Sequence, residues 1–591
     1  MTRHEPWRLL AIDLGAGGPW RATPWTPREP AFERMASWRG GGLGLALLGE
    51  SASSPPSSPP LVLAVGECVA RGVPTAARVS VASRSPLSGF LSEGLVGSDF
   101  GRRLASVADA VRIDGRAPAD SVLVIEADGS ARIARAPATR GLSSAATHAA
   151  LEAELGPCAT LSIGPGGERG AKIASLAACS SKSAGGGPPH FVGRGGLGAV
   201  LGRTGLKALV VRAPAVPSVR DSELTRALRS SPRLEARARG GTLELAHSLA
   251  ARGDLGDGAR DAGSARAFAE GAELARLHQH GCAGCPTPCG WVFRRADGPG
   301  QAARFGASHA LGLQLGFSDF DAALGLLARC DELGLDAKEV GAGLALLAEL
   351  DPGLRGCPEL FARVLDEAAL GEGRAAALVD GVHALGLALG VASTTVRRSS
   401  VRPDKNLASL LGQCVSARGT DPMRAFPFLA AESAGLASLR ELCRPLELPP
   451  GSEDPFQATA KGRLVGWHED LVLALDLTGF CAFSACALLS DRLASLDALA
   501  AWIAPRALAA EETFGRAPGR ALLAAGAEIA RAQRELNARW GWTPADDVPA
   551  WAAARLSSPG MEPEYRAYRR DPTSFEREAT APAPIVATKA G

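Results

Sequence analysis

Short apolar segments separated by turn-forming residues fill the first third of the chain. Each is four to seven residues long and is bounded mainly by Gly, Pro, Asp or Ser, which is typical of β-strands. The segments lie at residues 8–14, 61–65, 79–83, 122–125 and 208–211. Residues 1–213 are therefore predicted to form a β-rich domain.

From about residue 214 onward, apolar positions recur every three or four residues, which is the spacing of amphipathic helices. The predicted helices cover residues 224–228, 265–277, 321–333, 337–350, 374–389, 428–442, 463–475, 496–514 and 520–540. The expected fold class is α+β, in which the β-rich domain is followed by two mainly α-helical domains at 214–395 and 396–591.

The composition narrows the classes of function. A formal net charge of +2 gives no reason to expect a nucleic acid or an anionic membrane as a partner. No stretch reaches the ~20 apolar residues of a membrane-spanning helix, and the N-terminus lacks an apolar signal core. The 12 cysteines are irregularly spaced, unlike a secreted disulfide framework. We therefore expect a cytoplasmic protein whose thiols are free to hold a metal centre.

Three cysteines lie close together in the middle of the chain, in the pattern C-x2-C-x3-C. They are Cys282, Cys285 and Cys289. Thiolates are the soft ligands that iron–sulfur clusters require, and three such ligands need a fourth. Cys481 is the predicted fourth ligand, and Cys486 is the alternative.

A zinc site is the competing interpretation of the same motif. His278 and His280 stand just before it and could complete a zinc site locally. A structural zinc site usually draws a second close pair of ligands, and the second half of the chain offers none. The pattern therefore favours an iron–sulfur cluster.

Glycine-rich patches interrupt the predicted strands at residues 39–44, 163–168 and 193–198. The third patch satisfies G-x-G-x-x-G, but a dinucleotide site would need a strand directly before it. The preceding residues 183–189 do not read as a strand. Gly193 and Gly195 fit equally well with close backbone approach to another phosphate-bearing cofactor.

Several motifs, taken in order, resemble the aldehyde:ferredoxin oxidoreductase family of tungsten- or molybdenum-dependent enzymes with a bis-pterin cofactor. The resemblance runs from Trp7 almost to Asp547. Its matching pieces are residues 73–78, 85–90, 163–168, 193–200, 205–211, the cysteine motif from Cys282, 331–336 and 476–481. No single motif decides the resemblance; their order and spacing carry it.

The resemblance implies that the β-rich domain forms a base under the pterins and that the helical domains close over it. It also implies a [4Fe-4S] cluster and a bis-molybdopterin that carries tungsten or molybdenum, with magnesium as a further candidate. The expected partners are a small-molecule substrate and a ferredoxin or electron-transfer subunit.

Two aspartate motifs share the form D-x-x-G, then an apolar residue, then Asp or Cys. The first contains Asp331 and Asp336. The second contains Asp476, Gly479 and Phe480, and ends at the predicted cluster ligand. A carboxylate can accept two hydrogen bonds at once from the amino group and ring N–H of a pterin, so one motif per pterin is expected. Read alone, each motif would more often be an ordinary helix C-terminus.

Arginines within the family-like motifs are candidates for the pterin phosphates, because a guanidinium group suits phosphate recognition. We assign this role to Arg78 and Arg194, with Arg169 and Lys172 as weaker candidates.

The departures from the family pattern fall on the substrate side. No Glu stands at 304–309, and no E-x-x-H stands at 325–328, so the family's interface iron and iron-bridged dimer are not expected; a dimer without bridging iron remains open. Leu95 occupies the place of an Asn near the pterin magnesium, and Pro422 that of the active-site histidine. Asp421 and His309 are the candidate catalytic acid–base groups.

Three hypotheses follow from these features. The first is an oxidoreductase that oxidises an aldehyde-like substrate and passes electrons through the cluster to a ferredoxin or partner subunit. The second is a degenerate homologue that serves as a cofactor-binding electron-transfer or assembly subunit. The third is a zinc-structured protein without pterin.

Overall fold

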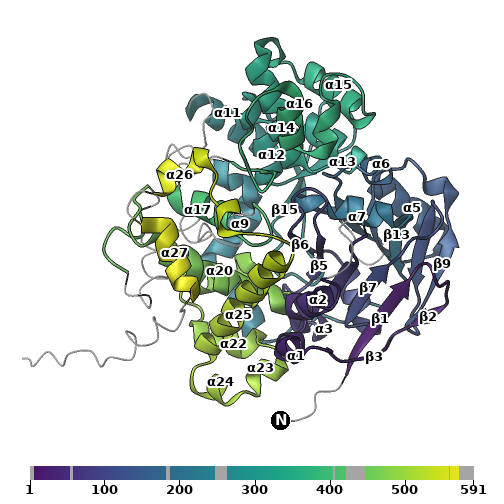
Figure 1. The fold of residues 1–591 in the computed structure, drawn as a ribbon, viewed down its shortest axis with the longest axis vertical. Helices are drawn as coiled ribbons and strands as arrows, with labels where there is room; N and C mark the ends of the chain where they lie inside the picture. Colours follow the sequence, from purple (N-terminus) through teal and green to yellow (C-terminus); the bar gives the residue numbers. More distant parts are fainter. Residues whose placement is uncertain are drawn as a thin grey trace, which may run out of the picture.

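A computed structural model describes residues 6–570, apart from 53–57, 182–186, 247–261, 403–405, 421–422, 424–445, 447, 455 and 558–559. The predicted helix at 428–442 and the candidate Asp421 therefore lie outside the described residues. Figure 1 shows two sheets in the N-terminal part and helices through most of the remaining chain. The α+β class with a sheet-rich part followed by helical parts is confirmed.

The first large sheet has six strands in the order β3-β1-β7-β4-β5-β6. A parallel pair, β1 and β7, is extended by antiparallel neighbours on both sides. The strands are β1 (Trp7–Asp13), β3 (Thr23–Trp25), β4 (Leu61–Val65), β5 (Val79–Arg84), β6 (Leu91–Val96) and β7 (Ala110–Asp114).

The second large sheet has the order β12-β11-β10-β13-β8-β9-β2 and repeats the first. Its parallel pair is β8 and β13, and its other pairings are antiparallel in the same sequence. The strands are β2 (Trp20–Arg21), β8 (Ser121–Ile125), β9 (Ser130–Arg135), β10 (Ala159–Ile163), β11 (Leu176–Ser180), β12 (His190–Val192) and β13 (Leu206–Val211). Since the chain visits equivalent strands in the same order, the two halves of this part share one topology.

Helices connect and cover the strands of both halves. They are α1 (Pro30–Ser37), α2 (Gly40–Gly49), α3 (Glu67–Ala70), α4 (Phe100–Val107), α5 (Ser144–Leu155), α6 (Pro165–Glu168) and α7 (Leu197–Arg203). The first glycine-rich patch begins the buried helix α2. A Cβ on Gly42 would lie 2.2 Å from the carbonyl oxygen of Met35, so the glycines let neighbouring backbone approach closely.

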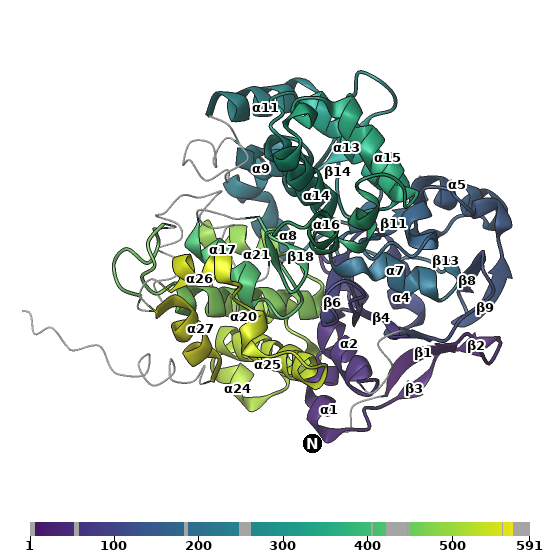
Figure 2. The same ribbon diagram turned by 45° about the horizontal axis from the view of Figure 1, so that its top comes forward.

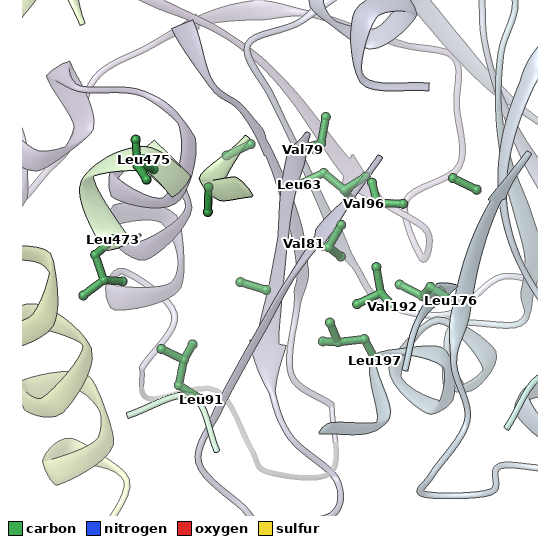
Figure 3. Packing of buried hydrophobic residues seen from close by; sticks show 14 of the residues in the cluster. Leu63, Val79, Val81, Leu91, Val96, Leu176, Val192, Leu197, Leu473 and Leu475 are labelled. Atoms are coloured by element: carbon green, nitrogen blue, oxygen red, sulfur yellow. The ribbon is translucent and has the colours of Figure 1, made fainter. Parts of the chain in front are cut away.

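The edges of the two sheets meet at β6 and β12. A Cβ on Gly94 of β6 would lie 2.2 Å from Cγ1 of Val192, so the strands leave no space for a side chain there. Figure 3 shows Val81 and Val96 of the first half close to Val192 and Leu197 of the second. One apolar core therefore runs under both sheets and fixes them relative to each other.

The middle of the chain contains a small antiparallel sheet and a helical lobe. The sheet has the order β14-β15-β16, from β14 (Arg276–His280), β15 (Gly290–Phe293) and β16 (Gln301–Ala303). The helices are α8 (Glu223–Arg229), α9 (Pro232–Gly240), α11 (Ala262–Leu274), α12 (Phe305–Leu311), α13 (Phe320–Leu333), α14 (Ala337–Leu350), α15 (Pro358–Ala369) and α16 (Val382–Leu389).

Two predicted helices of this lobe are wrong in extent. The helix expected at 265–277 ends at Leu274, and the chain then enters β14. The helix expected at 374–389 is divided, because Gly381 has φ +101°, a backbone conformation that no α-helix contains. The apolar periodicity of the sequence did not predict either of these helix ends.

The C-terminal part is helical around a central pair, α20 (Lys461–Thr478) and α25 (Pro518–Arg539), as Figure 2 shows. The other elements are β17 (Thr395–Val396), β18 (Ser399–Ser400), α17 (Leu407–Val415), α21 (Ala482–Ser490), α22 (Leu496–Ile503), α23 (Arg506–Ala509), α24 (Glu512–Arg516), α26 (Ala550–Leu556) and α27 (Met561–Arg570). The single helix predicted at 496–514 is three short helices, separated near Pro505.

The last described helix, α27, is tied to α20 by buried charges. Arg569 of α27 forms ion pairs with Glu469 and Asp470, and Tyr568 donates to Asp470 at 2.6 Å. Across the described residues, no helix is both long and apolar enough to span a membrane.

Candidate functional site

The sheet-rich part and both helical parts line a common cavity of about 580 Å³. Most of the predicted site residues lie in its wall. These are Arg78, Gly193, Arg194, Cys282, Cys285, Cys289, His309, Asp331, Asp336, Asp476 and Cys481. Gly195, Gly479 and Phe480 do not line the cavity. The fold thus gathers residues that are up to 403 positions apart in sequence.

Three of the cysteines lie on the loop between β14 and β15. The amide N–H of Cys285 donates to the carbonyl of Cys282 at 3.0 Å, and Gly284 turns the loop with φ +73°. Cys481 reaches the same end of the cavity from the first turn of α21, where it is the N-cap residue. Two distant segments therefore present four thiols to one space.

Burial controls the protonation of these thiols. It raises the pKa of Cys282, although the positive charge of Arg78 opposes the rise, and it raises the pKa of Cys285 to about 12. Nearby Cys481 adds to both shifts, which shows that these sulfurs interact. Because burial disfavours thiolates here, a cationic metal centre would be needed to stabilise them together.

Arg78 connects the cysteines to the second aspartate motif. Its Nη2 lies 3.6 Å from Sγ of Cys481. Burial by itself would lower the pKa of Arg78, but electrostatic interactions with Cys481, Cys282 and Asp476 outweigh burial and raise the pKa. Its guanidinium group is therefore positively charged, between the thiols and a carboxylate.

The alternative ligands receive less support from the geometry. Cys486 is buried in α21 and does not line the cavity. His278 is exposed and also lies outside the cavity wall, whereas His280 lines it. Within the described part of the chain, no three His, Cys, Asp or Glu side chains are arranged to hold a single metal ion.

The two aspartate motifs occupy equivalent places on the duplicated sheets. Gly334 ends α13 with φ +69°, and Gly479 ends α20 with φ +76°. A Cβ on Gly164, which follows β10, would lie 2.8 Å from the amide nitrogen of Gly334. A Cβ on Gly66, which follows the equivalent β4, would lie 2.6 Å from that of Gly479. Each half of the sheet-rich part thus contacts one aspartate motif through a close approach between two glycines.

The carboxylates of the first motif differ in their surroundings. Asp331 accepts a hydrogen bond from Nε2 of Gln301 at 2.7 Å, and burial raises its pKa to about 7 despite that bond. Asp336 is the N-cap of α14 and accepts from the amide of Lys338 at 2.9 Å. Burial therefore favours the protonated form of Asp331 to a much higher pH than is usual for a carboxyl group.

The guanidinium group of Arg194 is held by protein acceptors. It pairs with Asp336 at 3.3 Å and with the buried Glu339 at 3.2 Å. It also donates to the carbonyl of Ser400 at 2.6 Å and to the hydroxyl of Thr420. Arg194, which was predicted to bind a pterin phosphate, thus links the sheet-rich part to both helical parts.

His309 lies in α12 and lines the cavity, and its ring centroid is 5.5 Å from that of Phe305. Thr420, the residue before the second catalytic candidate, is buried and also lines the cavity. Asp421 itself lies outside the described residues.

Comparison with known proteins places this geometry in a family. The model of the aldehyde ferredoxin oxidoreductase N-terminal domain matches residues 11–213, and that of domains 2 and 3 matches residues 221–567. The chain belongs to the aldehyde ferredoxin oxidoreductase family. The resemblance inferred from the ordered motifs is therefore confirmed. The members of this family are oxidoreductases.

Curated relatives within the family are similar at low identity. The tungsten-containing aldehyde ferredoxin oxidoreductase of Pyrococcus furiosus is 28% identical over 308 residues, which cover 49% of each chain. That of Pyrococcus abyssi is 27% identical over 368 residues, or 58% of each chain. The alignments therefore span about half the length of these relatives.

A solved structure shares the fold over nearly the whole chain. It is the active-site complex BamBC of benzoyl coenzyme A reductase, in complex with 1,5-dienoyl-CoA. The match has a TM-score of 0.74 at 19% identity, and it covers 97% of this chain and 94% of the other. That neighbour is a subunit of a multi-subunit complex.

The glycine-rich patch at residues 193–198 has a different local structure from the one expected. A strand, β12, stands directly before the G-x-G-x-x-G patch at Gly193, and α7 follows the patch. The prediction that no strand precedes this patch was therefore wrong. However, β12 is an edge strand that pairs antiparallel with β11. A dinucleotide site requires a parallel β-α-β unit, so the dinucleotide interpretation still fails.

Sequence reasoning missed several polar residues of the cavity wall. His190 and His280 face each other with ring centroids 6.2 Å apart. Burial lowers the pKa of His190 to about 3 and that of His280 to about 4, and Arg304 adds to both shifts. Both imidazoles are therefore neutral at pH 7. Only the fold brings them together, since 90 residues separate them in sequence.

The cavity fits an anionic cofactor. Its wall holds seven Arg or Lys side chains, but only four Asp or Glu side chains. In addition, Thr75 and Ser175 line the cavity, and their buried hydroxyls make no hydrogen bond with any residue that the structure describes. Excess positive charge and unpaired buried donors are the features that a phosphate-bearing pterin would satisfy.

Proposed function

We propose that this protein is an oxidoreductase that binds a [4Fe-4S] cluster and a bis-molybdopterin tungsten or molybdenum centre in this cavity. Its substrate would be aldehyde-like, and its electron acceptor a ferredoxin or a partner subunit. The observation that carries the proposal is that one cavity unites the four cysteines with both D-x-x-G motifs, which sit at equivalent positions of two topologically identical half-domains.

Cys282, Cys285, Cys289 and Cys481 would ligate the cluster, and their soft thiolates suit iron. Asp331 and Asp476 would each grip one pterin by accepting from its amino group and ring N–H. Arg78 would balance the negative charges of the thiolates and of the adjacent pterin. It already contacts Cys481, and its pKa is raised by Asp476. When bound, the metal–pterin centre would supply the redox chemistry, and the chain would position it.

His309 is the described candidate for moving a proton in the pocket, since it lines the cavity and an imidazole nitrogen can accept or donate a proton. Arg194 would act indirectly. By holding Asp336 and Thr420 together, it would fix the chain next to Asp421 relative to the first pterin motif.

Metal analysis of protein purified without oxygen tests the proposal. We expect about four iron atoms per chain, as a single four-iron cluster requires, together with tungsten or molybdenum. We also expect aldehyde-dependent reduction of a viologen dye. Iron without either heavy metal would indicate the electron-transfer or assembly homologue instead, and zinc alone would overturn both.

The ligand assignment has a matched control within the chain. Cys285→Ser should abolish the visible absorbance of the cluster, because the thiolate ligand is lost. Cys486→Ser changes a buried cysteine that does not line the cavity and should retain that absorbance. An unchanged spectrum in Cys285→Ser, or a bleached one only in Cys486→Ser, would contradict the assignment.

A further inference from the structure

A positively charged side chain stands in the cavity wall without an acidic partner. Arg304 precedes α12 directly, lines the cavity and is exposed to solvent. Among the residues that the structure describes, its guanidinium group takes part in no hydrogen bond and no ion pair. By contrast, Arg194 pairs with Asp336 and Glu339. Arg304 is therefore a cation that forms no ion pair with any acidic residue in the described part of the chain.

Two further basic residues flank the same segment. A Cβ on Gly306 would lie 3.5 Å from Nζ of Lys338, so the absence of a side chain at Gly306 makes room for the ammonium group. The guanidinium carbon of Arg402 lies 6.0 Å from the ring centroid of Phe305. Both residues line the cavity. Three cationic side chains from three separate segments thus surround Phe305 and Gly306, and residues 304–309 contain no acid.

Arg304 is more exposed than the arginines that are expected to hold the cofactor. Arg78 and Arg194 are largely covered, and both have partners inside the protein. The field of an exposed cation in a cavity wall attracts anionic ligands from solvent.

We propose that Arg304, supported by Lys338 and Arg402, binds an anionic group on the substrate, so that the preferred substrate is an aldehyde that carries a carboxylate or a phosphate. This inference rests on the proposed function and specifies its substrate class. A guanidinium group offers two parallel N–H donors to either anion, which gives orientation as well as attraction. The aldehyde carbon would then lie at a fixed distance from the bound anion, toward the interior of the cavity.

Matched pairs of aldehydes test the inference on the holoenzyme. We would compare 4-oxobutanoate with butanal, and glycolaldehyde phosphate with glycolaldehyde, by viologen reduction. The kcat/KM should be at least about tenfold higher for the charged member of one pair, since one charge-assisted contact is expected to contribute that much. The pair that shows the larger ratio identifies carboxylate or phosphate as the recognised anion. Equal kcat/KM values within both pairs would overturn the inference.

Arg304→Gln should bring that ratio close to one, mainly by raising the KM of the charged aldehyde. Arg294→Gln removes the same charge from an exposed residue outside the cavity wall, so it should preserve the ratio. Tungsten, molybdenum and iron contents should be unchanged in Arg304→Gln. A loss of tungsten or molybdenum in that variant would show that the guanidinium group holds the cofactor, which would also overturn the inference.

A direct binding measurement distinguishes failure of this inference from failure of the proposed function. If no aldehyde is oxidised, the proposed function fails, and calorimetric titration with 4-oxobutanoate and with glycolaldehyde phosphate still tests anion binding. Saturable binding of either compound that weakens at least about tenfold in Arg304→Gln supports the site. The absence of binding by both compounds refutes it.

Discussion

Replacing Arg194 by methionine should loosen the contact between the sheet-rich part and the two helical parts. The side chain holds Asp336 at 3.3 Å, Glu339 at 3.2 Å and the Ser400 carbonyl at 2.6 Å. Methionine keeps much of the apolar volume and removes every one of these donors. Glu339, whose side chain is only 1% exposed, would then be a buried carboxylate without its cationic partner.

The size of the stability loss depends on the hydrogen bonds that Glu339 keeps in the variant. Breaking a buried ion pair by removing one partner costs about 3–5 kcal/mol. Two backbone donors remain, the amides of Ser400 at 2.7 Å and Val382 at 3.3 Å, so the loss should lie near the lower end. A loss of about 3 kcal/mol in local stability corresponds to a roughly hundredfold faster amide exchange where opening is local.

The loss should also depend on pH. Burial raises the pKa of Glu339 above its ordinary value of 4.5, Arg194 opposes the rise, and Asp336 adds to it. The folded state therefore binds this proton more tightly than the unfolded state, so the stability that it contributes is present at low pH and is lost as pH rises through the folded pKa. Without Arg194 the folded pKa rises further, so the destabilisation should be largest near pH 8 and should shrink toward pH 5.

Hydrogen–deuterium exchange of peptides that cover residues 382–389 and 395–402 is the suitable assay, with rates corrected for the intrinsic effect of pH. Arg194→Met combined with Glu339→Gln should recover part of the protection, because the leftover charge is gone. Arg212→Met removes an exposed partner of Glu126 and should change little, since exposed pairs contribute about 0–1 kcal/mol. Equal exchange at pH 5 and pH 8 in Arg194→Met, or no recovery in the double variant, would refute the reasoning.

Two further predictions concern the aspartate motifs. The pKa of Asp331 is about 7, so cofactor-free protein should lose stability as pH rises from about 4 to 8, and Asp331→Asn should remove this loss; identical pH profiles of the melting temperature would count against the raised pKa. Gly66→Ala would place a Cβ 2.3 Å from the carbonyl oxygen of Thr478, so it should cost about 1–3 kcal/mol and lower the iron content. Gly325→Ala, whose Cβ would meet nothing within 4 Å, should leave both quantities unharmed, and a similar loss of iron in the two variants would show that the contact at Gly66 is unimportant.

The strand pattern of the N-terminal part was readable from the sequence, because buried strands between turns leave continuous apolar runs. All five predicted strands are present, from β1 to β13. Their full pairing was not readable, because partners such as β1 with β7 and β8 with β13 lie far apart in sequence. The repeated topology of the two sheets, and hence the equivalence of Gly66 and Gly164, emerged only from that pairing.

Helix breaks also depended on information that periodicity lacks. Gly381 divides a predicted helix because its backbone has positive φ, although the apolar spacing continues across it. The glycine-rich start of α2 gave no helical signal, since glycine weakens helices. In the folded protein that cost is offset by close packing against Leu477 of α20, whose carbonyl oxygen would lie 2.1 Å from a Cβ on Gly40.

What the sequence determined by itself was the family, together with the candidate ligands: four soft sulfurs and two D-x-x-G motifs in the family's order. These are properties of residue type and spacing, which a linear chain states directly. What only the tertiary structure decided was which charges are compensated. Arg194, predicted to bind phosphate, is held by Asp336 and Glu339, whereas Arg304 forms no ion pair with any residue that the structure describes. Compensation depends on distances between residues far apart in sequence, and such distances exist only once the chain has folded.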